Sequence, residues 1–236
     1  MKQFSFAPHW RCLPIFVSSL LVGCAVGTAP LSDALSALAA QAFDASNTSI
    51  VGAKLNPAYR YLRVDVPGRA SALLVLGYID KHPLGEIEVW YSAMGEVIKT
   101  QNGRIVGSSG LEHDWRIVRY APAPPPWSAV PAQGISYERQ HDEMPGYRYA
   151  ISETVTLQPW TGLPPAAAQM PSANATAAGA AWFREEAHSS SGASLPPAWF
   201  AWGVQQGQPA VVYSKQCLTN TFCLQLQPWP PTESAP

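Results

Sequence analysis

Cys24 is the residue whose surroundings indicate chemistry most clearly. It ends the run Leu21-Val22-Gly23-Cys24, which follows an apolar stretch over 13–22 and two earlier basic residues. The apolar stretch has about the length of a secretory signal core and is too short to span a bilayer. A small residue followed by cysteine is the bacterial lipobox pattern, in which the thiol is alkylated by diacylglycerol and the chain is cut before it. A plain signal peptide with a chance cysteine is the alternative.

A lipidated Cys24 would make a bilayer the first partner of this chain. One acyl chain binds only marginally, at ~0.8 kcal/mol per buried methylene, whereas three chains together make a durable anchor. An aspartate after the cysteine usually retains a lipoprotein in the inner membrane, and this chain has Ala25 there. The sequence therefore predicts a signal peptide over 1–23, a tether over 24–30, and a domain anchored to the outer membrane by acyl chains and facing the periplasm.

Two further cysteines, Cys217 and Cys223, lie near the C-terminus. Disulfides persist in an oxidising compartment, so we expect these thiols to pair and close a short loop. A metal-binding pair is the alternative, but neither a histidine nor a second cysteine pair lies nearby to complete a zinc site. We therefore predict a disulfide, no metal site and no cofactor.

A pair of carboxylates and an indole form the next candidate site. Glu86 and Glu88 share a predicted strand face at about 7 Å, which falls within the range of glycosidase carboxylate pairs. Such acidic pairs are also common on solvated strands, and we favour that interpretation. Trp90 is predicted on the same face and to be exposed. Because flat aromatic rings stack on pyranose rings, Trp90, Glu86 and Glu88 are possible glycan contacts; the alternative is that Trp90 packs in the core.

Two other acidic features have structural interpretations. The run Glu112-His113-Asp114 could be an acid–base cluster, but neighbouring strand residues point to opposite faces, so we interpret it as a solvated turn. Glu153 lies on an otherwise apolar strand face, where an ion pair with Arg63 or Arg116 is favoured over a polar cavity. The chain contains no Gly-x-Ser-x-Gly, phosphate-binding glycine loop or His-Glu-x-x-His motif. We therefore predict no catalytic residue.

Most of these residues are predicted to lie on β-strands. Apolar and polar residues alternate over 59–66, which is typical of a strand with one buried face. The segment 70–79 is nearly all apolar, as in a strand buried on both faces. Asn102-Gly103 separates two further runs and provides the positive φ angles of a type I′ hairpin turn. Further strands are predicted over 86–91, 114–120, 147–157, 181–187, 199–205, 210–214 and 222–226. In the strand 147–157, one face is predicted to carry Tyr147, Tyr149, Ile151, Glu153, Val155 and Leu157.

The remaining segments are predicted to be a short helix and loops. Apolar residues at helical spacing predict a short N-terminal helix over 31–43. Proline-rich residues 121–134 and the Ala/Pro-rich segment 159–180 are predicted loops, and 228–236 a disordered tail. Successive strands joined by short turns indicate an antiparallel meander, so we expect a single all-β domain over 31–227, either a barrel or a sandwich.

Composition excludes two classes of protein. The formal net charge is −1 and the chain has no basic block, so the electrostatic footprint of a nucleic-acid binder is missing. Only 13% of residues are charged, whereas 23 are proline and 17 glycine, which favours many turns over a helical bundle.

Several stretches together carry a family resemblance. They are Tyr61–Val64, Ala72–Tyr78, Glu88–Ser92, Ile98–Val106, Gly110-Leu111 and Asp114-Trp115. Over 56–119 the chain resembles the YjbF/GfcB family, lipoproteins encoded with the machinery for exopolysaccharide or group 4 capsule production. The resemblance implies an all-β, periplasm-facing fold and an accessory role in polysaccharide secretion, with polysaccharide or export-machinery proteins as partners. The insert over 164–179 is not a feature of this resemblance.

The residues leave two other functions open. A periplasmic polysaccharide-modifying enzyme would have clustered carboxylates or histidines in a cleft. A lipid- or lipoprotein-shuttling barrel would need an apolar cavity large enough for acyl chains. The leading interpretation is an outer-membrane lipoprotein that assists exopolysaccharide or capsule secretion without being an enzyme.

Overall fold

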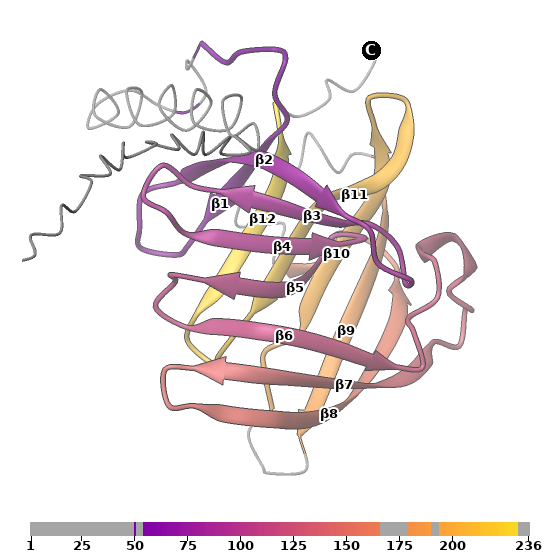
Figure 1. Cartoon of the computed structure of the whole chain (residues 1–236). Helices are drawn as coiled ribbons and strands as arrows, with labels where there is room; N and C mark the ends of the chain where they lie inside the picture. Colours follow the sequence, from indigo (N-terminus) through magenta and orange to yellow (C-terminus); the bar gives the residue numbers. More distant parts are fainter. Residues whose placement is uncertain (1–49, 51–53, 166–178, 190–193, 231–236) are drawn as a thin grey trace, which may run out of the picture.

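The protein is described by a computed structural model that covers residues 50, 54–165, 179–189 and 194–230. Within these ranges, twelve antiparallel strands form one sheet, which curls into a nearly closed barrel (Figure 1). The predicted all-β meander is confirmed, as a barrel. The strands are β1 (Tyr61–Asp65), β2 (Ala72–Asp80), β3 (Ile87–Tyr91), β4 (Val97–Gln101), β5 (Arg104–Ser109), β6 (Asp114–Ala121), β7 (Ile135–Met144), β8 (Arg148–Trp160), β9 (Ala181–Ser189), β10 (Ala198–Gln205), β11 (Gln208–Cys217) and β12 (Cys223–Trp229).

Helices contribute little to the described part of the chain. A 3-10 helix, η2 (Trp127–Ala129), lies in the proline-rich connection between β6 and β7. The helix predicted over 31–43 and the predicted tether lie outside the described residues. None of the described helices is long and apolar enough to cross a membrane.

The barrel is a meander that closes on itself at two places. Strands that are consecutive in sequence pair with one another, except β5 and β6, and the first strand, β1, pairs with the last, β12, so that Tyr61 lies opposite Trp229. The predicted tail from 228 onward therefore begins inside β12. At the second place, the two sheet edges β5 and β6 lie side by side.

Side chains hold the seam between β5 and β6 near the turn that joins them. The Ser108 hydroxyl donates to Asp114 Oδ1 at 2.7 Å and accepts from the Trp115 backbone N–H at 3.1 Å. Farther out, Arg116 Nη1 donates to the Ser109 hydroxyl at 2.7 Å. These contacts take the place that ladder hydrogen bonds have elsewhere in the sheet.

The β4–β5 hairpin confirms the prediction made from Asn102-Gly103. Asn102 and Gly103 have φ angles of 50° and 79°, as a type I′ turn requires. A Cβ added at Gly103 would lie 2.5 Å from the Cβ of Val211, so only glycine fits where the turn meets β11. From the same strand, the Gln216 amide accepts from the Ile105 N–H at 2.8 Å and donates to the Gly103 carbonyl at 2.9 Å.

The interior consists of two apolar clusters and, between them, charged side chains. Alternate residues of β1 to β5 and β12 point inward, as the period of two requires. The first cluster includes Leu62, Val64, Leu74, Trp90, Ile98, Trp115, Leu224 and Leu226. The second includes Trp127, Tyr137, Val155, Leu157, Phe183 and Phe200.

Two strands differ from their predictions. The segment 70–79 was expected to be buried on both faces, but Tyr78 and Ile79 at the end of β2 are exposed. There β2 runs toward its turn with β3, past a register shift between Leu76 and Tyr78. Strand β7 was not predicted at all, because its buried residues are not apolar: Tyr137, Arg139 and His141 alternate inward. An apolar alternation is therefore absent even though the strand has one buried face.

Strand β8 has the predicted inward face only from Ile151 onward. Its pairing with β7 shifts between His141 and Glu143, so that Asp142 lies opposite two residues, Tyr149 and Ala150. A one-residue bulge transfers the preceding side chains to the other face of the sheet. Tyr147 and Tyr149, predicted on the face of Glu153, are therefore exposed instead.

Candidate functional site

The two carboxylates considered as a pair each have a cation of their own. Glu86 forms an ion pair with Lys81, and both side chains are exposed. Glu88 forms an ion pair with Arg60 across to the segment before β1. The structure thus places the two glutamates in separate ion pairs and not in a catalytic couple; Glu86 is exposed, as the solvated interpretation expects, whereas Glu88 is half-buried.

The expectation that Trp90 is exposed is wrong. Its side chain is 3% exposed and belongs to the first apolar cluster, because its strand face points into the barrel. The indole N–H donates to the Thr100 hydroxyl at 2.9 Å, and that hydroxyl donates to Glu88 Oε2 at 3.1 Å. Trp90 packs in the core, and its ring does not present a surface on which a sugar could stack.

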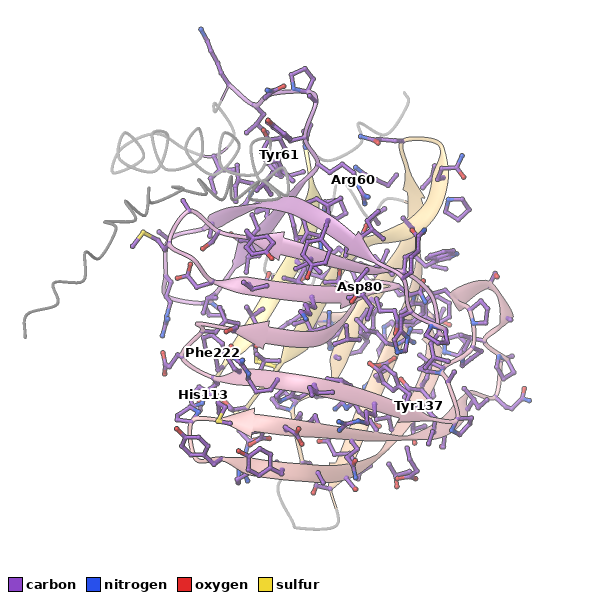
Figure 2. All side chains as sticks on the ribbon, viewed as in Figure 1. Arg60, Tyr61, Asp80, His113, Tyr137 and Phe222 are labelled. Carbon is purple, nitrogen blue, oxygen red and sulfur yellow. A yellow bond between two sulfur atoms is a disulfide. The ribbon has the colours of Figure 1, made fainter. Side chains whose placement is uncertain are left out.

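Glu112 and His113 lie in the turn and Asp114 begins β6, so the run 112–114 is only partly a solvated turn. Asp114 is buried and accepts hydrogen bonds from the Ser108 hydroxyl at 2.7 Å and the Gly110 N–H at 3.0 Å, which fixes the β5–β6 turn. Glu112 pairs with Arg69 at the surface. His113 packs on Phe222, with ring centroids 5.6 Å apart (Figure 2). The interpretation of Asp114 as solvated is corrected.

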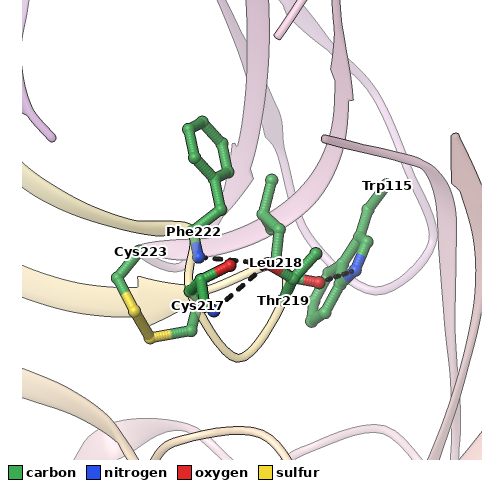
Figure 3. The surroundings of a disulfide bond; sticks show 7 residues. Trp115, Cys217, Leu218, Thr219, Phe222 and Cys223 are labelled. Atoms are coloured by element: carbon green, nitrogen blue, oxygen red, sulfur yellow. Dashed lines mark hydrogen bonds between the residues drawn. A yellow bond between two sulfur atoms is a disulfide. The ribbon is translucent and has the colours of Figure 1, made fainter. Parts of the chain in front are cut away.

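Cys217 and Cys223 form a disulfide between the facing ends of β11 and β12 (Figure 3). Within the short loop that it closes, the Leu218 N–H donates to the Phe222 carbonyl at 2.9 Å. The Leu218 carbonyl accepts from the Trp115 indole N–H at 3.1 Å, which ties the loop to the β6 side of the barrel. Among the described residues, no group of three or more His, Cys, Asp or Glu could hold a metal ion.

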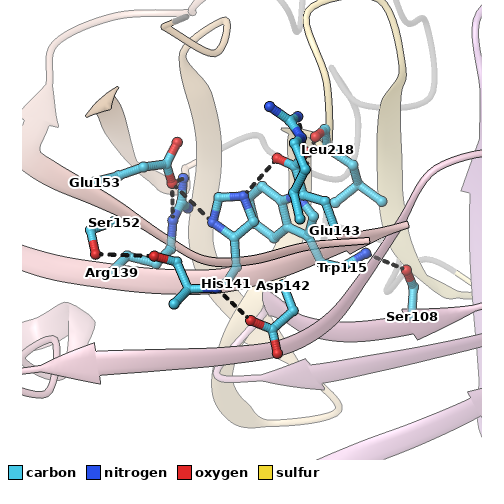
Figure 4. Close-up of polar contacts among 11 residues, drawn as sticks. Ser108, Trp115, Arg139, His141, Asp142, Glu143, Ser152, Glu153 and Leu218 are labelled. Carbon is cyan, nitrogen blue, oxygen red and sulfur yellow. Dashed lines mark hydrogen bonds and ion pairs between the residues drawn. The ribbon is translucent and has the colours of Figure 1, made fainter. Parts of the chain in front are cut away.

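A chain of ionisable side chains runs from the surface into the barrel at β7 and β8 (Figure 4). Arg148, at the surface, pairs with Glu143, whose Oε1 lies 2.9 Å from Nε2 of the buried His141. The other imidazole nitrogen lies 3.4 Å from Glu153 Oε2, an ion-pair distance. Glu153 accepts two hydrogen bonds from Arg139, from Nη2 at 2.7 Å and from Nε at 2.9 Å.

The partner expected for Glu153 was wrong, although an ion pair is present. Glu153 pairs with Arg139, which is its direct cross-strand neighbour on β7. Arg63 instead pairs with Asp65, two residues along its own strand. Because β7 was not recognised, the sequence offered no reason to choose Arg139. An alternation of polar residues in 137–141 facing Glu153 is the signal that could have identified it.

A second buried ion pair lies deeper in the barrel. Arg104 Nε donates to Glu185 Oε1 at 2.7 Å, and the Tyr137 hydroxyl donates to the same oxygen at 2.7 Å. The Arg104 guanidinium lies over the Trp127 ring, 3.8 Å from its centroid. Its Nη2 is buried and has no hydrogen-bond partner among the described residues. A guanidinium that stacks on an indole face keeps part of its electrostatic stabilisation without that bond.

The electrostatics of these groups fix their protonation. Burial would raise the pKa of Glu153, but the neighbouring His141 and Arg139 outweigh it and hold the pKa below its usual value. Burial, with the charge of Glu185, raises the pKa of Tyr137. Burial raises the pKa of Tyr120 to about 12. The Glu153 carboxylate stays charged and both phenols stay neutral near pH 7, so these three groups are not poised to exchange protons with a substrate.

The described interior residues line a cavity of about 20 Å³. It has room for one water molecule and is far smaller than the hundreds of Å³ typical of ligand pockets. Two charged groups and one amide share the lining with apolar side chains, so it would suit a water, and its size is too small for an acyl chain. The lining residues are Trp115, Arg139, Glu185, Ala187, Leu195, Pro196, Ala198, Gln216 and Cys217.

Comparisons with known proteins bear on the whole barrel. A family described as group 4 capsule polysaccharide lipoprotein gfcB, YjbF, matches residues 36–162. The crystal structure of the hypothetical lipoprotein YmcC from Escherichia coli (K12) is similar, with a TM-score of 0.60 and 19% sequence identity. The match covers 86% of this chain and 96% of that one, and at this identity it supports the fold alone. No curated protein matches the sequence.

Proposed function

This chain belongs to the YjbF family of group 4 capsule polysaccharide lipoproteins, and we propose that it is a non-enzymatic accessory of exopolysaccharide or capsule secretion. The observation that carries the proposal is the family match over residues 36–162, which includes strands β1 to β8. In this proposal the barrel is tethered to the outer membrane through a lipidated Cys24 and faces the periplasm. There it contacts polysaccharide or the proteins that export it.

The state of the acidic side chains favours an accessory over a modifying enzyme. General acid–base catalysis needs a group whose pKa lies near the working pH and which can reach the substrate. The buried carboxylates Glu153 and Glu185 are held by arginines, and Asp114 is occupied by hydrogen bonds of its turn. The surface glutamates Glu86 and Glu88 are each paired with a cation.

Deleting the gene tests the proposed function. We expect surface and secreted polysaccharide to fall, while pools of sugar nucleotides stay at their normal level, because an accessory acts after synthesis of the precursors. Unchanged polysaccharide output in the deletion strain would contradict the proposal.

Complementation of that strain separates the accessory from the enzyme. A gene that carries both Glu86→Gln and Glu88→Gln is expected to restore polysaccharide output to the wild-type level, because these groups are in surface ion pairs. Lost output with normal protein abundance would favour a polysaccharide-modifying enzyme instead.

A further inference from the structure

The hairpin of β7 and β8 carries the two most exposed aromatic side chains that the structure describes. Tyr147 and Tyr149 are 72% and 63% exposed. The bulge at Ala150 turns both away from the barrel interior, and Arg148 between them, itself exposed, pairs with Glu143. Large aromatic side chains are more often buried than exposed, so two rings this open on one hairpin are unusual.

On this hairpin the backbone at Tyr147 and at Ala150 has a conformation that residues other than glycine rarely adopt. Tyr147 has a φ of 54° and Ala150 a φ of 55°, both in the left-handed region. A bulky residue there is strained, and such strain persists only where the surroundings enforce it. Residues strained in this way cluster at binding sites, so the conformation of Tyr147 is a reason to look for a ligand.

Contacts at the surface and one connection into the barrel support the hairpin conformation. The Ala150 N–H donates to Asp142 Oδ1 at 2.8 Å. Arg148 is joined through Glu143 to His141, which is buried and stacks on the Trp115 ring with centroids 4.3 Å apart. The rings are thus mounted on a hairpin that is fixed before any ligand arrives, and this lowers the entropic cost of binding.

Behind the two rings, the outer face of the hairpin bears paired hydroxyl, amide and carboxyl groups. Gln140 Nε2 donates to the Ser152 hydroxyl at 3.3 Å, and the Thr154 hydroxyl donates to Glu138 Oε1 at 2.9 Å. Both pairs are exposed cross-strand partners, in register with one another. We call this surface the tyrosine–hydroxyl strip; it consists of Tyr147, Tyr149, Gln140, Ser152, Glu138 and Thr154.

We propose that the tyrosine–hydroxyl strip binds polysaccharide, with the rings of Tyr147 and Tyr149 stacking on sugar faces. The proposal rests on the proposed function and names the surface that performs it. Aromatic rings present flat apolar faces to the C–H groups of a pyranose, and the polar pairs exchange hydrogen bonds with its hydroxyls. Ten residues of strand extend about 30 Å, which is long enough for several sugar units.

The composition of the strip favours a glycan over a protein partner. Stable protein interfaces bury about 800 Å² on each side around apolar anchors that lose contact with water. Apart from its two rings, the strip is polar. Weak contacts suffice for a long repeating polymer, because many barrels on one membrane can hold the same chain at once.

The test measures binding of the polysaccharide that the producing strain itself secretes, purified from its medium, to the full-length protein in detergent. Affinity electrophoresis compares wild type with Tyr147→Ala/Tyr149→Ala, and with Tyr147→Phe/Tyr149→Phe, which keeps the rings. Tyr78→Ala serves as the control, since Tyr78 is an exposed tyrosine on β2. We expect at least tenfold weaker binding for the double alanine variant. The phenylalanine variant and Tyr78→Ala should stay within about threefold of wild type.

A second variant examines the polar part of the strip. Thr154→Val removes the hydroxyl while keeping the side-chain shape, and we expect it to weaken binding about threefold or more. Equal binding of wild type and the double alanine variant, with both proteins folded, would overturn the proposal. Failure of the wild-type protein to bind the polysaccharide would overturn it as well. The same holds if the strip proves necessary only for co-purification with export proteins, without binding of the polysaccharide.

The same measurements distinguish failure of the strip from failure of the proposed function. Low polysaccharide output in the deletion strain, combined with no binding by the purified protein, would contradict glycan binding by the strip and support the proposed function. Ring-dependent binding, combined with normal polysaccharide output in the deletion strain, would support glycan binding by the strip and contradict the proposed function.

Discussion

Buried charge governs how single residues behave in this barrel. Arg139 and Glu153, and Arg104 and Glu185, are at most about a tenth exposed. Removing charges from water is costly, and an ion pair returns that cost only with good geometry and further hydrogen bonds. A pair of this kind is weak evidence for high stability, but losing one partner leaves the other charge unpaired in the interior.

Glu153→Gln should therefore destabilise the barrel by about 3–5 kcal/mol, because the Arg139 guanidinium loses its counter-charge while staying buried. Chemical denaturation followed by tryptophan fluorescence measures the change in unfolding free energy. The matched control is Glu138→Gln on β7, where the side chain is exposed and the effect should stay within about 0.5 kcal/mol. A loss below about 1 kcal/mol for Glu153→Gln would show that the pair is not needed.

Tyr120 links stability to alkaline pH. Burial raises its pKa from 10.0 to about 12 in the native state. The native state thus prefers the protonated phenol. The stabilisation that the folded protein gains from this preference is complete below pH 10 and is lost as pH rises toward 12. We expect the unfolding free energy to fall over this range, and to fall less steeply in Tyr120→Phe, which cannot ionise. The exposed Tyr147→Phe serves as the control. Parallel pH curves for wild type and Tyr120→Phe would refute this assignment.

At the scale of elements, turns and bulges determine which face of a strand is buried. The type I′ turn at Asn102-Gly103 sets the register of β4 and β5, and the bulge at Ala150 reverses the outer part of β8. Both are local backbone features. Their consequences reach across the barrel, because the β4–β5 turn packs on β11 and the β8 bulge exposes two aromatic rings.

Gly103→Ala should destabilise the protein more than Gly68→Ala. The two glycines have nearly the same φ, 79° and 78°, so the backbone penalty is shared. A Cβ at 103 would lie 2.5 Å from Val211 Cβ, whereas nothing lies within 4 Å at 68. We expect an additional loss of about 1–3 kcal/mol for Gly103→Ala, from the forced separation of the hairpin and β11. Thermal or chemical denaturation of the two variants measures it. Equal losses would mean that the turn is free to move away from β11.

At the scale of the molecule, the chain enters and leaves the barrel at one end. Tyr61, at the start of β1, lies opposite Trp229, at the close of β12. In an antiparallel meander, a turn from an odd-numbered to the following even-numbered strand lies at the other end, and the β7–β8 turn is one of these. A tether that leads back to Cys24 would thus begin at the end opposite to Tyr147.

Cys24→Ser should abolish lipidation and cleavage before residue 24, because the thiol is the acceptor of the diacylglycerol. Cells fed a palmitate analogue should label the wild-type protein and not the variant. As control, Cys217→Ser removes a thiol of the disulfide and is expected to keep the label. Equal labelling of wild type and Cys24→Ser would mean that the lipobox prediction is wrong.

The sequence by itself determined what depends on neighbours along the chain. Alternation of apolar residues predicted β1 and β3, Asn102-Gly103 predicted a type I′ hairpin, and the run of short strands predicted an antiparallel meander. A turn type and a strand period are set within a few residues, so they can be read without knowing the rest of the fold. The lipobox at Cys24 is local in the same way, and it stays a prediction.

Only the tertiary structure decided which face of each strand is inside and which charge meets which. Trp90 shares a strand face with two glutamates, yet that face is the interior, because closure of the barrel placed it against β1 and β12. Glu153 forms its ion pair with Arg139 because β7 pairs with β8, and the bulge in β8 places Tyr147 on the outer face. Partners and faces arise from pairing between strands and from barrel closure, neither of which is encoded in a window of neighbouring residues.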